Sequence, residues 1–471
     1  MSNYKKVTSN IIVKLQIIVG VEYVLSGAAI LDHYAYDAGT RKDILRYPEI
    51  VVLPGSSQEV AEIMKLANKH LIPVTPRGGG SGLAGGAVAL KGGILLDLAR
   101  MNRIIHVDIA AKYMIVEAAV RTLDIQNEAK RHGLLYAGDP CSSDDCVIAG
   151  NVATNAGGNK AVKYGVTADQ VYELEIVTPQ GKILNLGGRL KKNSTGYSLI
   201  KLIAGSEGTL GIITKITLKL QKLAPLLPNF LAIFPNLATA VTLVEALLAE
   251  KNALDTTSLE LMDRHTVIAI ENYQKTKIFY GDVGDVLLIQ LEAQTQEDVK
   301  VKELYLQELC SLHNCLDIRS IEGEAIWRGR RQWGKALEVD EPTGASEDLV
   351  VPVDLITPFI QNLESLTTSF QFDFRIAGHA GDGNLHLRIL PGTVPIEEWE
   401  NKLKEFREVL YAVTYSLGGR LSGEHGIGFK RKYFLRSVIQ PDELELMKNL
   451  KKAFDPNFIL NPGKIFDIDA S

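Results

Sequence analysis

The sequence predicts an α+β fold divided into two domains, and three observations indicate this. The chain has 471 residues and 46% apolar content, which exceeds one typical hydrophobic core. Short apolar segments alternate with amphipathic helical segments, and this pattern restarts after APLLP at residues 224–228. We therefore expect one domain over 1–223, a second over 224–440, and a tail over 441–471 that returns to the first domain.

The N-terminal segment predicts an amphipathic helix. Its apolar residues recur at helical spacing and are Ile11, Ile12, Leu15, Ile18 and Val19. Lys14, Gln16 and Glu22 interrupt the run, so a signal peptide is not indicated. No apolar run reaches the roughly 18 residues of a membrane span. We expect a cytoplasmic protein without a transmembrane segment, which reaches a membrane surface only through a partner.

The remaining elements follow from alternation, helical spacing and capping residues. In the first domain, the helix over 56–71 has Ser57 as its expected N-cap. In the second domain, we expect helices on one face of an antiparallel sheet. The predicted strands are 50–53, 72–80, 93–98, 104–108, 114–120, 230–234, 257–262, 286–294, 316–321, 372–377 and 387–390, and the predicted helices are 56–71, 123–133, 236–251, 296–313, 441–453 and one beginning at Asp263.

Residues 77–86 (RGGGSGLAGG) form a glycine loop in which 80–85 matches the pattern GxGxxG. A dinucleotide fingerprint also needs a helix directly after the glycines and an acidic residue about 20 positions on. The following AVALKGGILLDL predicts loop and strand, so a Rossmann site is not indicated. The glycines still let successive N–H groups converge on an anion, and Arg77 adds positive charge. A flexible surface loop would have a similar composition.

A second run of small residues, IAGNVATNAGGNKAVKYG, covers 148–165. Glycine and alanine at this density let the backbone pass close to a flat ligand. Asn151, Thr154 and Asn155 supply amide and hydroxyl groups for hydrogen bonds. Structural turns could have the same composition, but two such runs in one domain favour a large, planar cofactor that carries phosphate.

The segment GHAGDGNLH (378–386) carries two histidines between two predicted strands. Positions seven apart on a regular strand face opposite sides of a sheet. The turn at Gly381, Asp382 and Gly383 breaks that count and can bring His379 and His386 together. Two neutral imidazoles are two thirds of a catalytic zinc-type site. A structural polar cluster is the alternative.

Six motifs in this order resemble those of FAD-linked D-2-hydroxyacid dehydrogenases. They are RGGGSGLAGG, GNVATNAGG (150–158) with KYG, GSEGTLGIIT (205–214), GHAGDGNLH, SGEHGIG (422–428) and NPGKIF (461–466). The most similar group comprises the glycolate oxidase D-subunit, D-lactate dehydrogenase and D-2-hydroxyglutarate dehydrogenase. The resemblance implies a PCMH-type (vanillyl-alcohol-oxidase-like) FAD-binding domain and an α+β, ferredoxin-like C-terminal cap domain.

The resemblance also implies a set of flavin-binding residues. Some relatives attach FAD covalently through a histidine in the glycine loop, whereas this loop has Ser81 and no histidine. Non-covalent FAD is therefore expected. The implied FAD-binding residues are Arg77, Gly78, Gly79, Gly80, Ser81, Gly82 and Gly85 in the loop, Pro140, Gly150, Asn151, Thr154, Gly157, Gly158 and Ile213 along the flavin, and Asn461 in the tail.

In the C-terminal half, the resemblance implies metal ligands at His379, His386 and Glu424 and a catalytic base at His425. A His₂Glu set leaves positions open for the α-hydroxyl and carboxylate of a 2-hydroxyacid, and it suits Zn, Mn or Fe. The base would take the hydroxyl proton while hydride leaves for flavin N5. Asp382 is expected to orient a ligand or shape the turn.

A carboxylate substrate also requires a guanidinium. The resemblance implies that Arg330 binds the substrate carboxylate, with Arg328 and Arg331 as the alternatives. Where 2-hydroxyglutarate enzymes carry a threonine and a lysine for the distal carboxylate, this chain aligns Gly334 and the acidic SED at 346–348. A small monocarboxylate such as glycolate or D-lactate is therefore favoured.

Charge and cysteine content exclude other classes. A net charge of −5 gives no reason to expect nucleic acid, and the four cysteines match no zinc-ribbon or thioredoxin spacing and are expected to be free thiols. The expected partners are the substrate and an electron acceptor or redox subunit, and a homodimer is compatible. The alternatives are an aryl-alcohol or sugar-type oxidase of the same fold, which would not need the histidine motifs, and a non-catalytic FAD-carrying subunit of a glycolate oxidase complex.

Overall fold

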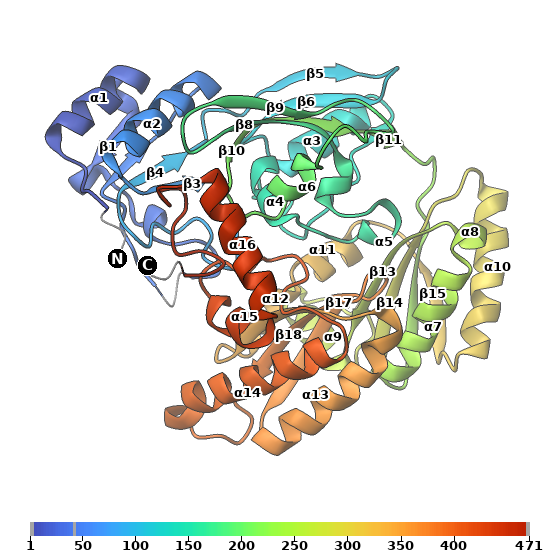
Figure 1. Ribbon diagram of the computed structural model, residues 1–471. Helices are drawn as coiled ribbons and strands as arrows, with labels where there is room; N and C mark the ends of the chain where they lie inside the picture. The colour runs from blue at the N-terminus through green and yellow to red at the C-terminus, as the bar shows by residue number, and fades with distance from the viewer. Residues whose placement is uncertain (1–3, 41–43, 468–471) are drawn as a thin grey trace. The chain divides into compact units, whose positions relative to one another are not determined.

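The computed structural model describes residues 4–40 and 44–467, and its elements are labelled in Figure 1. They form two compact units. The first contains residues 1–156, 166–223 and 425–471, and the second contains 157–165 and 224–424. The sequence analysis likewise places a domain boundary after residue 223. The return to the first unit begins at His425, however, and not at residue 441 as predicted.

A small sheet in the first unit carries the glycine loop. Its strand order is β1-β2-β4-β3, with the last three strands parallel. Helix α1 buries Ile11, Leu15 and Val19, as expected from their spacing. The N-cap of α2 is Ser56 and not Ser57, because the Ser56 side chain accepts from the N–H of Glu59. The elements are α1 (Ser9–Val19), β1 (Val24–Ser26), β2 (Ile50–Val52), α2 (Ser57–His70), β3 (Val74–Arg77) and β4 (Ile94–Asp97).

A second, antiparallel sheet completes the first unit with the order β5-β6-β10-β8-β9. Its buried residues share one hydrophobic core with α2, α3 and α4. The other α-helices and β-strands of the first unit, of which β7 and β11 form a separate pair, are β5 (Ile104–Asp108), β6 (Tyr113–Glu117), α3 (Thr122–Arg131), β7 (Leu134–Leu135), α4 (Ile148–Thr154), β8 (Val171–Val177), β9 (Ile183–Gly187), α6 (Leu199–Ile203), β10 (Ile212–Lys219), β11 (Gln221–Lys222), α15 (Lys432–Val438) and α16 (Pro441–Phe454).

Residues 459–461 of the tail lie beside β3. The N–H of Val74 donates to the carbonyl of Ile459 at 2.8 Å, and the N–H of Asn461 donates to the carbonyl of Val74 at 2.7 Å. The tail therefore extends the sheet next to the strand that leads into the glycine loop.

The second unit is built on a seven-stranded sheet with the order β15-β12-β14-β13-β17-β18-β16. Each pair of neighbouring strands is antiparallel, as predicted. The strands are β12 (Asn229–Phe234), β13 (Thr256–Met262), β14 (Asp285–Leu291), β15 (Asp317–Ile321), β16 (Ala345–Val350), β17 (Asp373–His379) and β18 (Asn384–Leu390).

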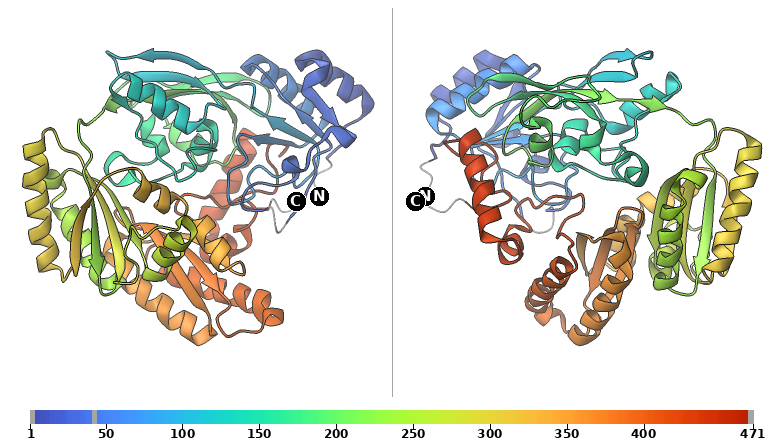
Figure 2. Two further views of the ribbon diagram at one scale, coloured as in Figure 1. Left: turned by 180° about the vertical axis from the view of Figure 1, so that it is seen from behind. Right: turned by 45° about the vertical axis from the view of Figure 1, so that its right-hand side comes forward.

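Helices cover both faces of this sheet, so the predicted single helical layer is wrong (Figure 2). Leu231 of β12 shares a core with Val267 of α9 and Ile326 of α11. Helix α7 packs on β12, β13 and β14, where neighbours such as Phe230 point to the opposite face and are also buried. The helices are α7 (Leu237–Ala249), α8 (Lys251–Leu254), α9 (Arg264–Gln274), α10 (Gln296–Leu312), α11 (Ala325–Arg331), α12 (Trp333–Asp340), α13 (Ile356–Phe370) and α14 (Ile396–Ser416).

A short segment from the first half of the sequence also belongs to the second unit. Residues 157–165 contain α5 (Ala161–Tyr164), which packs on β13. Lys163 Nζ lies 2.6 Å from both Asp255 Oδ1 and Glu292 Oε2, and the Tyr164 hydroxyl donates to Glu292. This segment includes Gly157 and Gly158, which the sequence analysis assigns to the FAD domain.

Candidate active site

The glycine loop of the first unit has several backbone N–H groups that are not used in bonds to the described protein acceptors. The carbonyls of Gly80 and Gly82 accept hydrogen bonds from the N–H groups of Ala38 and Gly39. Within residues 4–40 and 44–467, no N–H from Gly78 to Gly82 donates to a protein acceptor. An array of N–H groups on a glycine loop is a site for an anion such as a pyrophosphate.

Two of these glycines are required by close packing. A Cβ on Gly78 would lie 2.6 Å from a methyl of Val147, and a Cβ on Gly79 would lie 2.6 Å from the carbonyl of Asp145. Any side chain would therefore push the loop away from the segment behind it. The residues present fit the phosphate-bearing part of FAD.

Arg77 is held by the protein backbone. Its Nη1 donates to the carbonyl of Tyr36 at 2.8 Å, and its Nη2 donates to the carbonyl of His33 at 2.9 Å. The side chain is buried, and burial lowers its pKa, with the opposing charges of Asp97 and Asp37 raising it. These hydrogen bonds fix the Arg77 side chain against residues 33–36. Binding of a phosphate by Arg77 stays a prediction.

Two of the residues predicted to bind FAD form side-chain hydrogen bonds to other segments of the first unit. Asn461 is buried and donates to the carbonyls of Gly86 at 3.1 Å and Glu207 at 2.8 Å. Asn151 donates to the Thr122 hydroxyl at 2.6 Å. The other predicted FAD-binding residues of this unit lie in the glycine loop (Ser81, Gly85), before α4 (Pro140), on α4 (Gly150, Thr154) and on β10 (Ile213).

The two histidines of GHAGDGNLH converge, as the turn predicts. His379 ends β17 and pairs with Asn384, while His386 on β18 pairs with Ala377, so both imidazoles face the same side of the sheet. Their ring centroids are 5.3 Å apart. Gly383 permits the turn, since its φ is +81° and a Cβ there would lie 1.9 Å from the carbonyl of Val351.

Glu424 completes a three-residue cluster with the histidines. Its Oε1 lies 3.6 Å from His379 Nε2 and 3.4 Å from His386 Nε2, and the ligand atoms of the three residues lie within 4.8 Å of one another. These separations are long for a hydrogen bond. They match the roughly 3.3–3.5 Å between neighbouring ligands of a tetrahedral ion with bonds of about 2.0–2.1 Å. The residues present therefore fit a divalent metal.

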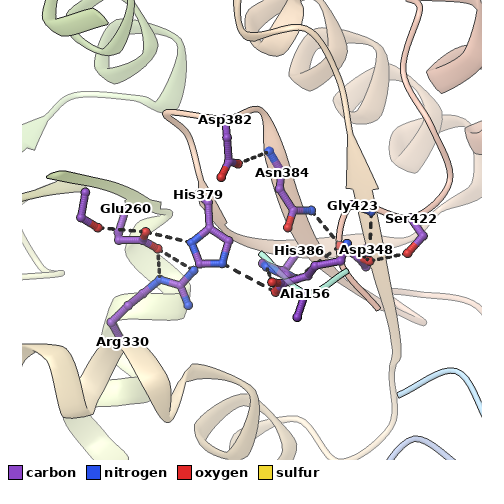
Figure 3. Close-up of polar contacts among 12 residues, drawn as sticks. Ala156, Glu260, Arg330, Asp348, His379, Asp382, Asn384, His386, Ser422 and Gly423 are labelled. Atoms are coloured by element: carbon purple, nitrogen blue, oxygen red, sulfur yellow. Dashed lines mark hydrogen bonds and ion pairs between the residues drawn. The ribbon is translucent and has the colours of Figure 1, made fainter. Parts of the chain in front are cut away.

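A carboxylate lies behind each imidazole, and the sequence analysis assigns neither a role. Glu260 pairs with His379 across β13 and β17, and Asp348 pairs with His386 across β16 and β18. Glu260 Oε1 is 2.8 Å from His379 Nδ1, and Asp348 Oδ1 is 3.9 Å from His386 Nδ1 (Figure 3). The sequence signal that could have identified Glu260 is the position of an acidic residue inside the otherwise uncharged strand TTSLELM.

Asp348 also supports the segment that carries Glu424. Its Oδ2 accepts from the N–H groups of Gly423 and Glu424 at 3.1 Å and from the Ser422 hydroxyl at 2.8 Å. Its Oδ1 accepts from the Asn384 amide at 2.7 Å. The acidic SED segment therefore helps to build the cluster.

Asp382 lies at the turn beside this cluster. Burial raises the pKa of its carboxyl to about 7, with Glu260 and Glu424 adding to the shift and His379 opposing it. Its Oδ1 accepts from the Asn384 N–H at 3.2 Å, which is a turn-shaping contact. The expectation that Asp382 shapes the turn agrees with this bond.

Arg330, the predicted carboxylate ligand, is bound to Glu260. Its Nε donates to Glu260 Oε2 at 2.8 Å, its Nη2 lies 2.8 Å from the same oxygen, and its side chain is 0% exposed (Figure 3). Binding of a substrate carboxylate by Arg330 stays a prediction. His425, the predicted base, follows Glu424 in the sequence and begins the return to the first unit.

The fold and these sites define a two-domain FAD-linked oxidoreductase. Residues 48–187 match the FAD binding domain family, and residues 228–465 match FAD linked oxidases, C-terminal domain. The chain belongs to the FAD-linked oxidase family. The predicted PCMH-type fold and the resemblance to FAD-linked enzymes are confirmed.

Several similar proteins align with this chain over nearly the whole of both sequences. The chain is 34% identical to a D-lactate dehydrogenase from Anaerostipes hadrus over 98% of both chains. It is 33% identical to glycolate oxidase subunit GlcD of Bacillus subtilis (strain 168), over 93% of this chain and 92% of that one. A D-2-hydroxyglutarate dehydrogenase from Stutzerimonas stutzeri is 30% identical, over 92% and 94%.

Solved structures share the fold at lower sequence identity. p-Cresol methylhydroxylase has a TM-score of 0.81 at 18% identity, over 99% of both chains. A 4-ethylphenol oxidase from Gulosibacter chungangensis has a TM-score of 0.75 at 18% identity, over 98% of this chain and 97% of that one. All four cysteines are free thiols, and among the described residues no helix has the length and apolar character needed to cross a bilayer.

Proposed function

We propose that this protein oxidises a small D-2-hydroxyacid, glycolate or D-lactate, to the 2-oxoacid with non-covalently bound FAD. FAD, when bound, accepts a hydride from the substrate's α-carbon, and a divalent ion, when bound, acts as a Lewis acid toward the α-hydroxyl. Three relatives support the substrate class, because their names refer to D-lactate, glycolate and D-2-hydroxyglutarate, all of them 2-hydroxyacids.

The observation that carries the proposal is the convergence of two imidazoles and one carboxylate. His379, His386 and Glu424 would hold the ion, and three protein ligands leave coordination positions for a chelating substrate. Their separations of 3.4 and 3.6 Å to a common oxygen support a shared ion. An aryl-alcohol oxidase would have no use for this cluster.

The acidic segment at 346–348 supports a substrate with one carboxylate. Glu347 is bound to Arg407 and to the Tyr411 hydroxyl, and Asp348 is bound to the segment of Glu424. Neither side chain offers positive charge to a distal carboxylate. Outside its own helix and chain neighbours, no heavy atom lies within 4 Å of a Cβ built at Gly334, and glycine has no side chain to bind a distal carboxylate.

Two residues are proposed to act on the substrate directly. His425 would accept the proton of the α-hydroxyl, since an imidazole can act as a general base and His425 directly follows the proposed metal ligand Glu424. Arg330 would bind the substrate carboxylate, because the planar donors of a guanidinium match the geometry of a carboxylate. The electrons would then pass to an external acceptor or a partner redox protein.

Steady-state kinetics of the purified chain test the proposal. The enzyme, with an artificial electron acceptor, is assayed against glycolate, both enantiomers of lactate, both of 2-hydroxyglutarate, and an aryl alcohol. We expect the highest kcat/KM for glycolate or D-lactate and at least a tenfold lower value for D-2-hydroxyglutarate. A preference for the aryl alcohol, or no reduction of FAD by any hydroxyacid, would contradict the proposal.

Substitution of the proposed base separates chemistry from cofactor binding. We predict that His425→Asn lowers kcat by roughly 10²–10⁴ while FAD content is unchanged, because a general base contributes about that factor. The measurements are kcat and the flavin-to-protein absorbance ratio. His132→Asn is the control, since His132 contacts Glu128 outside the cluster. A loss of less than threefold would show that another group accepts the proton.

A further inference from the structure

Glu260 lies in the middle of strand β13 with 0% of its surface exposed. A fully buried carboxylate is costly unless every oxygen is bonded, and here both oxygens are. Oε1 meets His379 Nδ1 at 2.8 Å, and Oε2 accepts from Arg330 Nε at 2.8 Å. We propose that Glu260 is a positioning residue, which holds His379 in the tautomer required for metal binding. The inference rests on the metal site of the proposed function.

The two nitrogens of His379 have different partners. Nδ1 faces Glu260, while Nε2 faces Glu424 Oε1 at 3.6 Å. A carboxylate only accepts hydrogen bonds, so Nδ1 must carry the proton and donate it. The lone pair of the neutral ring is then on Nε2, on the side of the other two ligands. The direct cross-strand pairing of Glu260 with His379 sets this arrangement.

Arg330 and Ser258 fix the orientation of the Glu260 carboxylate. Arg330 is 0% exposed, and its Nη2 also lies 2.8 Å from Oε2. Ser258 Oγ donates to Oε1 at 3.2 Å. A guanidinium has donors only, so Arg330 requires an acceptor from residue 260. The pair thus places Oε1 on His379 and keeps it there (Figure 3).

Glu260→Gln tests the proposal because an amide is asymmetric. The oxygen of the new amide must face Arg330, because a guanidinium only donates. The NH₂ group of the same amide then points toward His379 Nδ1. Nδ1 then accepts, and the proton of the neutral ring moves to Nε2, where the ion should bind. We expect the affinity for Zn²⁺ to fall by about 10- to 100-fold, the usual effect of losing such a partner.

The measurement uses the full-length, FAD-loaded enzyme after removal of metal with a chelator. Zn²⁺ affinity is measured by competition with a chromophoric chelator, and the visible spectrum of the Co²⁺ form reports on the ligand set. FAD content and melting temperature are recorded alongside. The matched control is Glu347→Gln, since Glu347 is also buried in the same sheet and paired with Arg407, but its cross-strand partner is Leu387 and not a histidine. The control should keep wild-type Zn²⁺ affinity.

A second substitution distinguishes positioning from general disruption. In the double variant Glu260→Gln/Arg330→Met, the amide is free to turn its oxygen to Nδ1 and restore the favourable tautomer. We expect it to bind Zn²⁺ more tightly than Glu260→Gln alone, although it has lost more contacts. If the single variant does not fold, the comparison of this double variant with Glu260→Met/Arg330→Met serves the same purpose. Only the glutamine version offers Nδ1 an acceptor, so it should bind Zn²⁺ about tenfold more tightly.

The outcomes separate this inference from the proposed function. Wild-type enzyme that binds no divalent ion would overturn the metal site and the inference with it. Wild-type enzyme that binds Zn²⁺, with Glu260→Gln binding equally well, would overturn the inference alone. Equal loss of affinity in Glu260→Gln and the Glu347→Gln control would show a general effect of removing buried charge, which also contradicts it. A selective loss that the double variant reverses supports it.

Discussion

At the scale of single residues, charged groups in this protein are buried where they hold segments together. Glu207 accepts from the N–H groups of Ile427 and Gly428 at 2.7 Å, and so joins the GSEG and HGIG motifs within the first unit. Burial raises the pKa of Glu207. Lys464 belongs to the same region, and its Nζ donates to the carbonyl of Val88 at 2.6 Å. These groups explain why the tail motif NPGKIF carries a lysine.

Lys464 should make stability depend on pH. Burial lowers its pKa to about 7 in the folded protein, with the charges of Asp37 and Glu207 opposing the shift, whereas an exposed lysine has a pKa near 10.4. Between these values the unfolded chain binds more protons, so this lysine raises stability as pH rises from 7 to about 10. We predict that the free energy of unfolding of wild type, minus that of Lys464→Met, increases over this range.

Urea unfolding at pH 7, 8.5 and 9.5 measures that difference. Lys130→Met is the control, since Lys130 is in the same unit and exposed to solvent. A difference that is flat or falls with pH would show that Lys464 keeps an ordinary pKa.

At the scale of elements, the β17–β18 hairpin positions the two histidines of the proposed metal site. Gly383→Ala would place a Cβ in the left-handed region and 1.9 Å from the carbonyl of Val351. We predict a loss of about 2–4 kcal/mol in the free energy of unfolding, the range for strain combined with a clash, and weaker Zn²⁺ binding. Chemical denaturation and metal competition measure the two effects.

Gly334→Ala is a matched control for this substitution. Gly334 is in α12, and a Cβ there would meet no heavy atom within 4 Å. Alanine in a helix is favoured over glycine by up to about 1 kcal/mol, so this variant should be as stable as wild type or more stable. Equal behaviour of the two variants would mean that the turn does not need glycine at position 383.

At the scale of the whole molecule, the glycine loop and the proposed metal site belong to different units. Flavin and metal occupancy should therefore be separable. We predict that prolonged chelation leaves the flavin spectrum nearly intact, abolishes reduction of FAD by substrate, and is reversed by Zn²⁺ or Mn²⁺. Anaerobic titration with substrate, followed by absorbance, measures this.

His386→Ala provides the control for the chelation experiment. It should retain FAD and resist rescue by added metal, because one ligand is missing. A fully active preparation that contains no stoichiometric divalent ion would exclude the metal site, and the cluster would then bind the substrate by hydrogen bonds alone.

The sequence by itself determined many of the strands and helices, the glycine loop and the convergence of His379 and His386. It predicted none of β8, β9, β10, β16, α13 and α14. The predicted features depend on local chemistry: alternation, capping, and a glycine turn between two strands. The pattern of apolar residues could not show that α9 and α7 cover opposite faces of the sheet in the second unit. Strands that are buried on both faces have apolar residues at odd and even positions alike.

Only the tertiary structure decided what lies next to the histidines. Glu260 is 119 positions from His379 and bonded to it through strand register, and Asp348 reaches Glu424 over 76 positions. Residues 157–165 likewise leave their neighbours in the sequence to join the second unit. Such contacts depend on which strands pair and in what register, and no spacing within a single segment encodes that choice.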